Sequence, residues 1–241
     1  MQGSTKAAGH CGYQARIFAR PMSTVRQIYE LLRWELKLEW RDKYALASIF
    51  LYVVTTVVIV YLAVGRGLEG ALFNALYWIV LFFGAMVAAT RSFLREGGRR
   101  HLYYYTIADP LALLFSKLIF NVLLIWIIGV LTYGLLSLFA PAAAIVHPLP
   151  FWCALLAGGF GLSTILTFVS AIAARAGGNA TLMAILSFPL VIPLLKLVLD
   201  AGTYAVDLGT NDYTQPLFLT LAVDLIALAV ALVLFPFVWR D

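Results

Sequence analysis

The chain has 241 residues, of which 63% are hydrophobic and 12% are charged, and its formal net charge is +5. A soluble domain has about twice that charged fraction, so the composition excludes one and predicts an all-α, polytopic membrane protein. The positive charge does not indicate nucleic-acid binding, because the basic residues lie where membrane topology would place them. Cys11 and Cys153 are too far apart to suggest a disulfide framework or a metal site.

The N-terminal segment, residues 1–23, is predicted to be a disordered tail. It lacks the apolar stretch of a secretory signal, and Met22 is an alternative start that would make residues 1–21 an extension.

Residues 24–44 are predicted to form an amphipathic helix in the inner membrane interface. Its apolar residues recur at helical spacing, and a polar stripe runs beside them. The apolar stripe is Tyr29, Leu32, Leu36 and Trp40, and the polar stripe is Arg26, Glu30, Arg33, Lys37 and Arg41. The helix anchors the chain to anionic lipid, and it either does only that or also forms part of a docking surface for a cytoplasmic protein.

Residues 45–239 are predicted to contain six transmembrane helices joined by short connections. The predicted spans are 45–64, 71–90, 110–139, 151–174, 180–199 and 216–238. Each is long enough to cross a hydrocarbon layer of ~30 Å. The third is longer than the bilayer requires, so it should tilt or extend beyond the hydrocarbon.

The distribution of Lys and Arg sets the expected orientation. With the N-terminus inside, fifteen of the seventeen basic residues lie on or near the inner face. Only Arg66 and Lys196 lie near the outer face. Both termini are therefore predicted to be cytoplasmic.

The connection between the second and third spans carries a dense charge cluster, Arg91–Tyr105. A positive-inside anchor would explain its arginines, but not its Glu96-Gly97-Gly98 turn or the run Tyr103–Tyr105. The loop is therefore the expected docking place for a soluble partner. The chain has no Gly-Lys pair, hence no phosphate-binding P-loop, and no clustered acidic pair. Energy for any driven process must come from another chain, and no metal site is expected.

Two charges lie inside predicted spans, Lys196 and Asp224. Intramembrane ionisable groups are candidates for a functional role. Lys196 could extend to the outer interface, pair with Asp224, or face a substrate. His147, in the outer loop, is a weak candidate ligand for haem iron, since the spacing offers no second ligand.

Pro189 and Pro193 interrupt the fifth span and remove two backbone donors. They predict a kink or a local unwinding, which serves either packing or a mobile element along a substrate route. Small residues should allow close helix approach, within the chain or between copies. They are Gly84, Ala88, Gly158, Gly159 and Gly161.

Three stretches resemble the haem exporter protein B family (CcmB), ABC-2-type permeases of the cytochrome c maturation system. They are Phe93–Gly98 with Asp109-Pro110 and Ser116–Leu118, then Arg175–Gly178, then Pro189–Leu195. The resemblance covers about residues 24–239 and implies the ABC-2-type permease fold. The loop departs from more acidic versions by its Arg99, Arg100, His101 and three tyrosines.

The resemblance implies a non-catalytic subunit of the bacterial inner (plasma) membrane, a homodimer that binds two copies of a separate ATPase (CcmA-type). It also implies a haem-handling membrane protein (CcmC-type) and a small tether (CcmD-type), with haem as a possible cargo and ATP bound by the partner. The expected ATPase-docking residues are Arg95, Glu96, Gly98, Arg99, Arg100, Leu102 and Tyr103. Two alternatives remain open: an ABC-2 permease for a lipid, glycan or drug, and a membrane scaffold that transports nothing.

Overall fold

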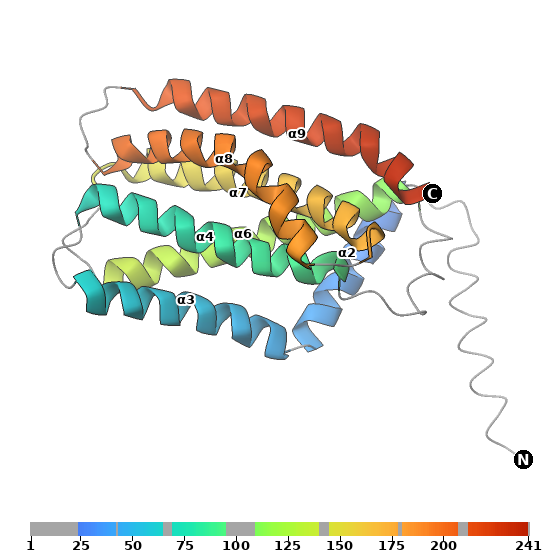
Figure 1. Cartoon of the computed structure of the whole chain (residues 1–241), viewed down its shortest axis with the longest axis horizontal. Coiled ribbons are helices and arrows are strands. Elements are labelled where there is room, and N and C mark those ends of the chain that lie inside the picture. The colour runs from blue at the N-terminus through green and yellow to red at the C-terminus, as the bar shows by residue number, and fades with distance from the viewer. Residues whose placement is uncertain are drawn as a thin grey trace, which may run out of the picture.

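The chain folds as a bundle of long helices in a computed structural model (Figure 1). The structure describes residues 24–41, 43–64, 69–94, 109–139, 145–177, 180–206 and 212–240. Its helices are α2 (Thr24–Arg41), α3 (Lys43–Val64), α4 (Gly70–Leu94), α6 (Pro110–Phe139), α7 (Pro148–Arg175), α8 (Ala180–Ala205) and α9 (Thr214–Arg240). The predicted tail, residues 1–23, lies outside the described residues.

The six helices after α2 are each long and apolar enough to cross a membrane. This confirms the predicted all-α polytopic membrane protein. The third span, Pro110–Phe139, has 30 residues, about 45 Å at the rise of an α-helix. It is therefore longer than the ~30 Å hydrocarbon layer.

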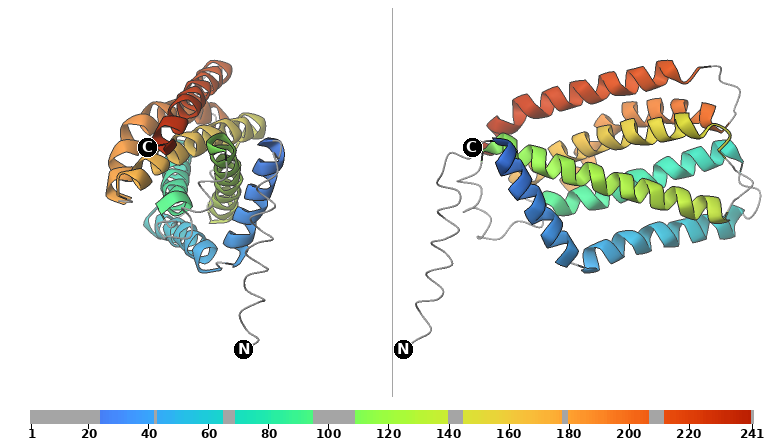
Figure 2. Two further views of the ribbon diagram at one scale, coloured as in Figure 1. Left: turned by 90° about the vertical axis from the view of Figure 1, so that its right-hand side faces the viewer. Right: turned by 180° about the vertical axis from the view of Figure 1, so that it is seen from behind.

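Helix α7 is the centre of the bundle. It packs against α4, α6, α8 and α9. Of its membrane-spanning stretch 83% is buried inside the bundle, against 17% for the corresponding stretches of α3 and α9. The end-on view in Figure 2 shows α3 and α9 on opposite sides of the bundle. The outward sides of these two helices consequently remain apolar and exposed.

Small residues let the helices approach closely within the chain. Gly158 of α7 lies against Trp78 of α4 and Val198 of α8, and Gly159 lies against Trp126 of α6. A Cβ at Gly158 would lie 2.7 Å from the Trp78 ring. The predicted close approach is confirmed for contacts inside one chain.

Helix α8 is continuous through Pro189 and Pro193, and Figure 1 shows it changing direction in its central part. The predicted break is thus a bend and not an unwound segment. Both prolines are exposed on the surface of α8. That position requires no neighbouring helix to fill the space around the rings.

Helix α2 crosses one end of the bundle and packs mainly on α6, as Figure 2 shows. Leu32 contacts the core, whereas Tyr29 and Leu36 are 60% and 48% exposed. The predicted apolar stripe is therefore divided between two faces, because α6 takes one side of it. The exposed half remains available for a membrane interface.

Candidate functional site

The end of the bundle that α2 crosses carries a buried ion pair between α2 and α6. Lys117 Nζ donates to Glu35 Oε1 at 2.8 Å, and the two side chains are 0% and 16% exposed. Ionised side chains this deeply buried need close pairing to offset their loss of hydration. The pair therefore fixes where α2 crosses α6.

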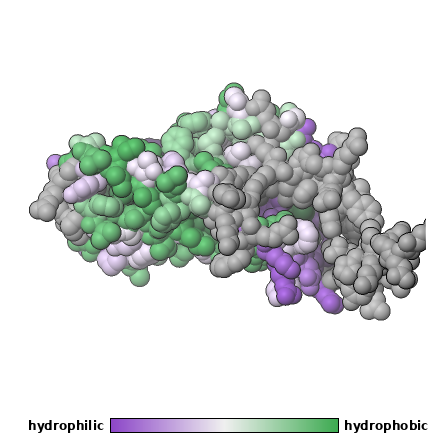
Figure 3. Space-filling model, turned by 90° about the horizontal axis from the view of Figure 1, so that it is seen from below, coloured by the Kyte–Doolittle hydropathy of each residue, from purple (hydrophilic) through white to green (hydrophobic). Residues whose placement is uncertain are grey.

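The charged surface of α2 lies at the same end of the molecule. Arg26, Arg33 and Lys37 are exposed, and Figure 3 shows hydrophilic side chains gathered here beside an apolar surface along the bundle. Helix α4 ends and helix α6 begins at this end (Figure 1). Of the two helices that flank the predicted docking loop, α6 packs against α2, and α4 ends at the same end of the bundle.

The predicted docking residues themselves lie outside the described residues. They are Arg95, Glu96, Gly98, Arg99, Arg100, Leu102 and Tyr103. Their roles stay predictions.

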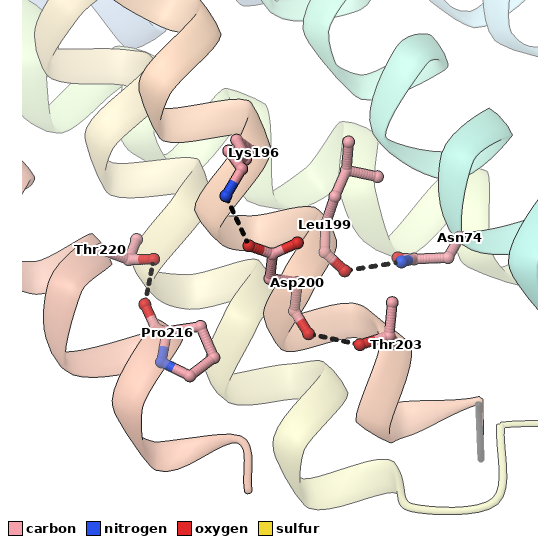
Figure 4. Close-up of polar contacts among 7 residues, drawn as sticks. All are labelled: Asn74, Lys196, Leu199, Asp200, Thr203, Pro216 and Thr220. Atoms are coloured by element: carbon pink, nitrogen blue, oxygen red, sulfur yellow. Dashed lines mark hydrogen bonds and ion pairs between the residues drawn. The ribbon is translucent and has the colours of Figure 1, made fainter. Parts of the chain in front are cut away.

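A second polar group lies toward the opposite end, between α4, α8 and α9 (Figure 4). Asn74 Nδ2 donates to the carbonyl oxygen of Leu199 at 2.9 Å. Lys196 Nζ lies 3.5 Å from Asp200 Oδ2, and these side chains are 77% and 50% exposed. Lys196, Leu199 and Asp200 lie within about one turn of α8, so these polar contacts gather in the C-terminal half of that helix.

Asp224 is not the partner of Lys196. Its side chain is buried, and neither carboxylate oxygen has a hydrogen-bond partner. Of the three possibilities for Lys196, the pair with Asp224 is wrong: Lys196 extends along the exposed side of α8 to Asp200, one turn closer to the C-terminal end of that helix. The two charges on which sequence reasoning focused therefore belong to different environments.

His147 stacks on Tyr204, with ring centroids 4.7 Å apart. Its backbone N–H donates to the carbonyl oxygen of Ala205 at 3.1 Å. These contacts attach the start of α7 to the end of α8. Among the described residues, no group of three or more His, Cys, Asp or Glu side chains could hold a metal ion.

The sequence does not predict the Lys117–Glu35 pair, because Lys117 also fits the general distribution of basic residues and Glu35 lies within an amphipathic helix. One signal was available: Lys117 stands inside an apolar run, between Ser116 and Asn121. Asn121 in turn donates to Thr167 Oγ1 of α7 at 2.8 Å. Polar residues at this spacing in a span indicate a face turned toward other helices.

Comparison with known families decides between the possible classes of membrane protein. The family model described as CcmB protein matches residues 26–239. The chain belongs to the CcmB family. The comparison with curated proteins gives no match.

Membership in the CcmB family makes the chain the membrane permease component of a haem-exporting ABC system for cytochrome c maturation. The match begins at Arg26, within the first turn of α2, and ends at Trp239, in the last turn of α9. Amphipathic helix and spans are therefore one family unit. The six apolar helices make this CcmB-family chain a multi-pass membrane protein.

Proposed function

We propose that this CcmB-family chain converts ATP hydrolysis by a separate ATPase into movement of its spans, for haem export or release of a haem-loaded chaperone. The chain would lie in the bacterial inner membrane as a homodimer, with both termini cytoplasmic. Its partners would be two CcmA-type ATPases, a CcmC-type haem-handling protein and a CcmD-type tether. The family match is the observation that carries this proposal.

The inner end of the bundle supports a mechanical role. Residues 95–108 connect α4 to α6. These two helices pack against each other and against the central helix α7. Helix α2 is held to α6 by the Lys117–Glu35 pair. A push on the loop would therefore act on α4 and α6 together, while α2 would follow α6.

Mechanical coupling is favoured over a haem channel through this subunit. The histidines of the sequence are His10, His101 and His147, and the transmembrane helices that the structure describes contain none of them. The spans therefore offer no imidazole for the iron of a haem passing between them. Release of cargo held by a partner needs no such ligand.

The test is the double variant Glu96→Ala/Leu102→Ala in the native host. Cytochrome c and the amount of bound ATPase should both fall, while membrane insertion persists, because the change removes docking contacts and leaves the spans intact. The matched control is Glu69→Ala/Leu149→Ala, which alters exposed residues at the opposite end of the bundle. Normal cytochrome c in the loop variant would show that the loop is only a topology anchor.

A further inference from the structure

Asp224 lies deep in the membrane part of the bundle. It is ten positions after Thr214, the first residue of α9, about 15 Å along the helix axis. Its side chain is 1% exposed. With Thr220, Ala231 and Phe235, it belongs to the set of buried residues on α9.

The carboxyl group of Asp224 occupies space left by a glycine. A Cβ at Gly161 of α7 would collide with Asp224 Oδ1, and it would come within 2.9 Å of Leu194 on α8. The carboxyl is therefore seated between α7 and α8. Any side chain at position 161 would displace it.

No described group compensates a charge on Asp224. Both carboxylate oxygens lack a hydrogen-bond partner. The titratable and charged residues on the three helices packed against α9 are Cys153 and Arg175 (α7), Lys196, Asp200 and Tyr204 (α8), and Lys117 and Tyr133 (α6). Lys196 pairs with Asp200 and Lys117 with Glu35.

The energetics favour a neutral carboxyl in this seat. An ionised Asp at the centre of a transmembrane helix is unfavourable even by insertion scales, and an unpaired buried charge normally neutralises instead. Ionisation would require α9 to leave Gly161 and admit water. Proton occupancy and the seating of α9 on α7 are therefore linked.

The buried residues of α9 on either side of Asp224 indicate from which end water could reach its carboxyl group. Toward the start of α9 the next buried residue is Thr220, whose hydroxyl donates to the carbonyl oxygen of Pro216 at 2.8 Å. In the other direction, the cluster of Ala231 and Phe235 with Leu113, Leu114 and Phe168 closes the contact with hydrocarbon. Water would enter from the end at which α9 begins.

We propose that Asp224 is a proton-binding site inside the membrane, which holds its proton while α9 is seated on Gly161 and exchanges it when α9 separates from α7. This inference does not depend on the identity of the cargo or of the ATPase. In this proposal the protonation of Asp224 changes with the packing of α9, which together with α3 is the least buried of the spans.

Infrared spectroscopy of the full-length chain in lipid vesicles tests the site. With carboxyl-labelled aspartate, the wild-type chain should show a protonated-aspartate band at neutral pH that shifts slowly in heavy water. Asp224→Asn should remove that band, and the control Asp200→Asn should remove carboxylate signal instead. Absence of a protonated-aspartate band in the wild-type chain would overturn the proposal, whether or not Asp224→Asn folds.

A glycine variant tests the link to packing. Gly161→Ala should make the exchange of the Asp224 proton about tenfold faster. The added methyl group overpacks the contact between α7 and α9, and the usual free-energy cost of overpacking corresponds to a factor of about ten or more in the opening equilibrium. Gly134→Ala is the matched control, since nothing lies within 4 Å of its added Cβ. Equal exchange rates in the two variants would show that seating on Gly161 does not govern the proton.

Discussion

At the scale of single residues, close helix contacts depend on the absence of a side chain. A Cβ at Gly202 of α8 would collide with the amide of Asn74, which donates to the Leu199 carbonyl oxygen. That hydrogen bond attaches the start of α4 to the C-terminal part of α8. One methyl group at position 202 should therefore separate two spans.

We expect Gly202→Ala to destabilise the chain by about 1–3 kcal/mol, the cost of leaving a buried polar group without its partner. Gly134→Ala should be neutral or slightly stabilising, since alanine favours a helix interior. The Tm of each purified variant in detergent measures the difference. Equal Tm values for the two variants would contradict the role given to the Asn74 contact.

Asp212, just before α9, provides a prediction about pH. Hydrogen bonds from the Thr214 hydroxyl and from its backbone N–H hold the pKa of this carboxyl below its ordinary 3.8. A depressed pKa stabilises the folded state above the ordinary value, and this contribution is lost as pH falls through the folded-state pKa. The first turn of α9 should therefore loosen on acidification.

Amide hydrogen exchange in the first turn of α9 measures that loosening. For the wild-type chain, the ratio of the measured exchange rate to the intrinsic rate should rise in acid. In Asp212→Asn this ratio should be independent of pH, because the side-chain amide can still accept the hydrogen bonds but does not titrate. A pH-dependent ratio in Asp212→Asn would assign the effect to another group.

At the scale of the elements, the spans could be predicted because long apolar runs leave few alternatives in a membrane. The predicted span 110–139 coincides with α6, and the predicted span 180–199 ends six residues before α8 does. Apolar content cannot give side-chain partners. Tyr29, Leu32 and Leu36 fit one helical stripe in the sequence. In the structure Leu32 packs on the core, whereas Tyr29 and Leu36 stay exposed, and the sequence does not show this difference. Lys196 turns to Asp200 because the exposed side of α8 is where its charge remains hydrated.

The attachment of α2 to α6 gives the prediction at this scale. Glu35→Ala removes the carboxylate that pairs with the buried Lys117 and should cost about 3–5 kcal/mol, whereas Glu35→Leu/Lys117→Met should recover most of that loss. Thermal unfolding of the single and double variants measures the recovery. A double variant as unstable as Glu35→Ala would mean that the pair does not hold α2 in place.

At the scale of the whole molecule, the chain has a polar end crossed by α2, an apolar bundle and a smaller polar region toward the opposite end. The first of these combines the exposed cations of α2, the Lys117–Glu35 pair, the end of α4 and the start of α6. The bundle buries most of α7 and leaves the outward sides of α3 and α9 apolar. In the proposed function, work received at one end would move helices within the membrane.

In the proposed function, an external ATPase supplies this work. Affinity purification of the tagged full-length chain from native membranes, followed by mass spectrometry, tests this most directly. We expect an ABC-type ATPase in amounts comparable with the chain, and a clear reduction for Glu96→Ala/Leu102→Ala. Purification of the intact wild-type chain without any ATPase subunit would contradict it.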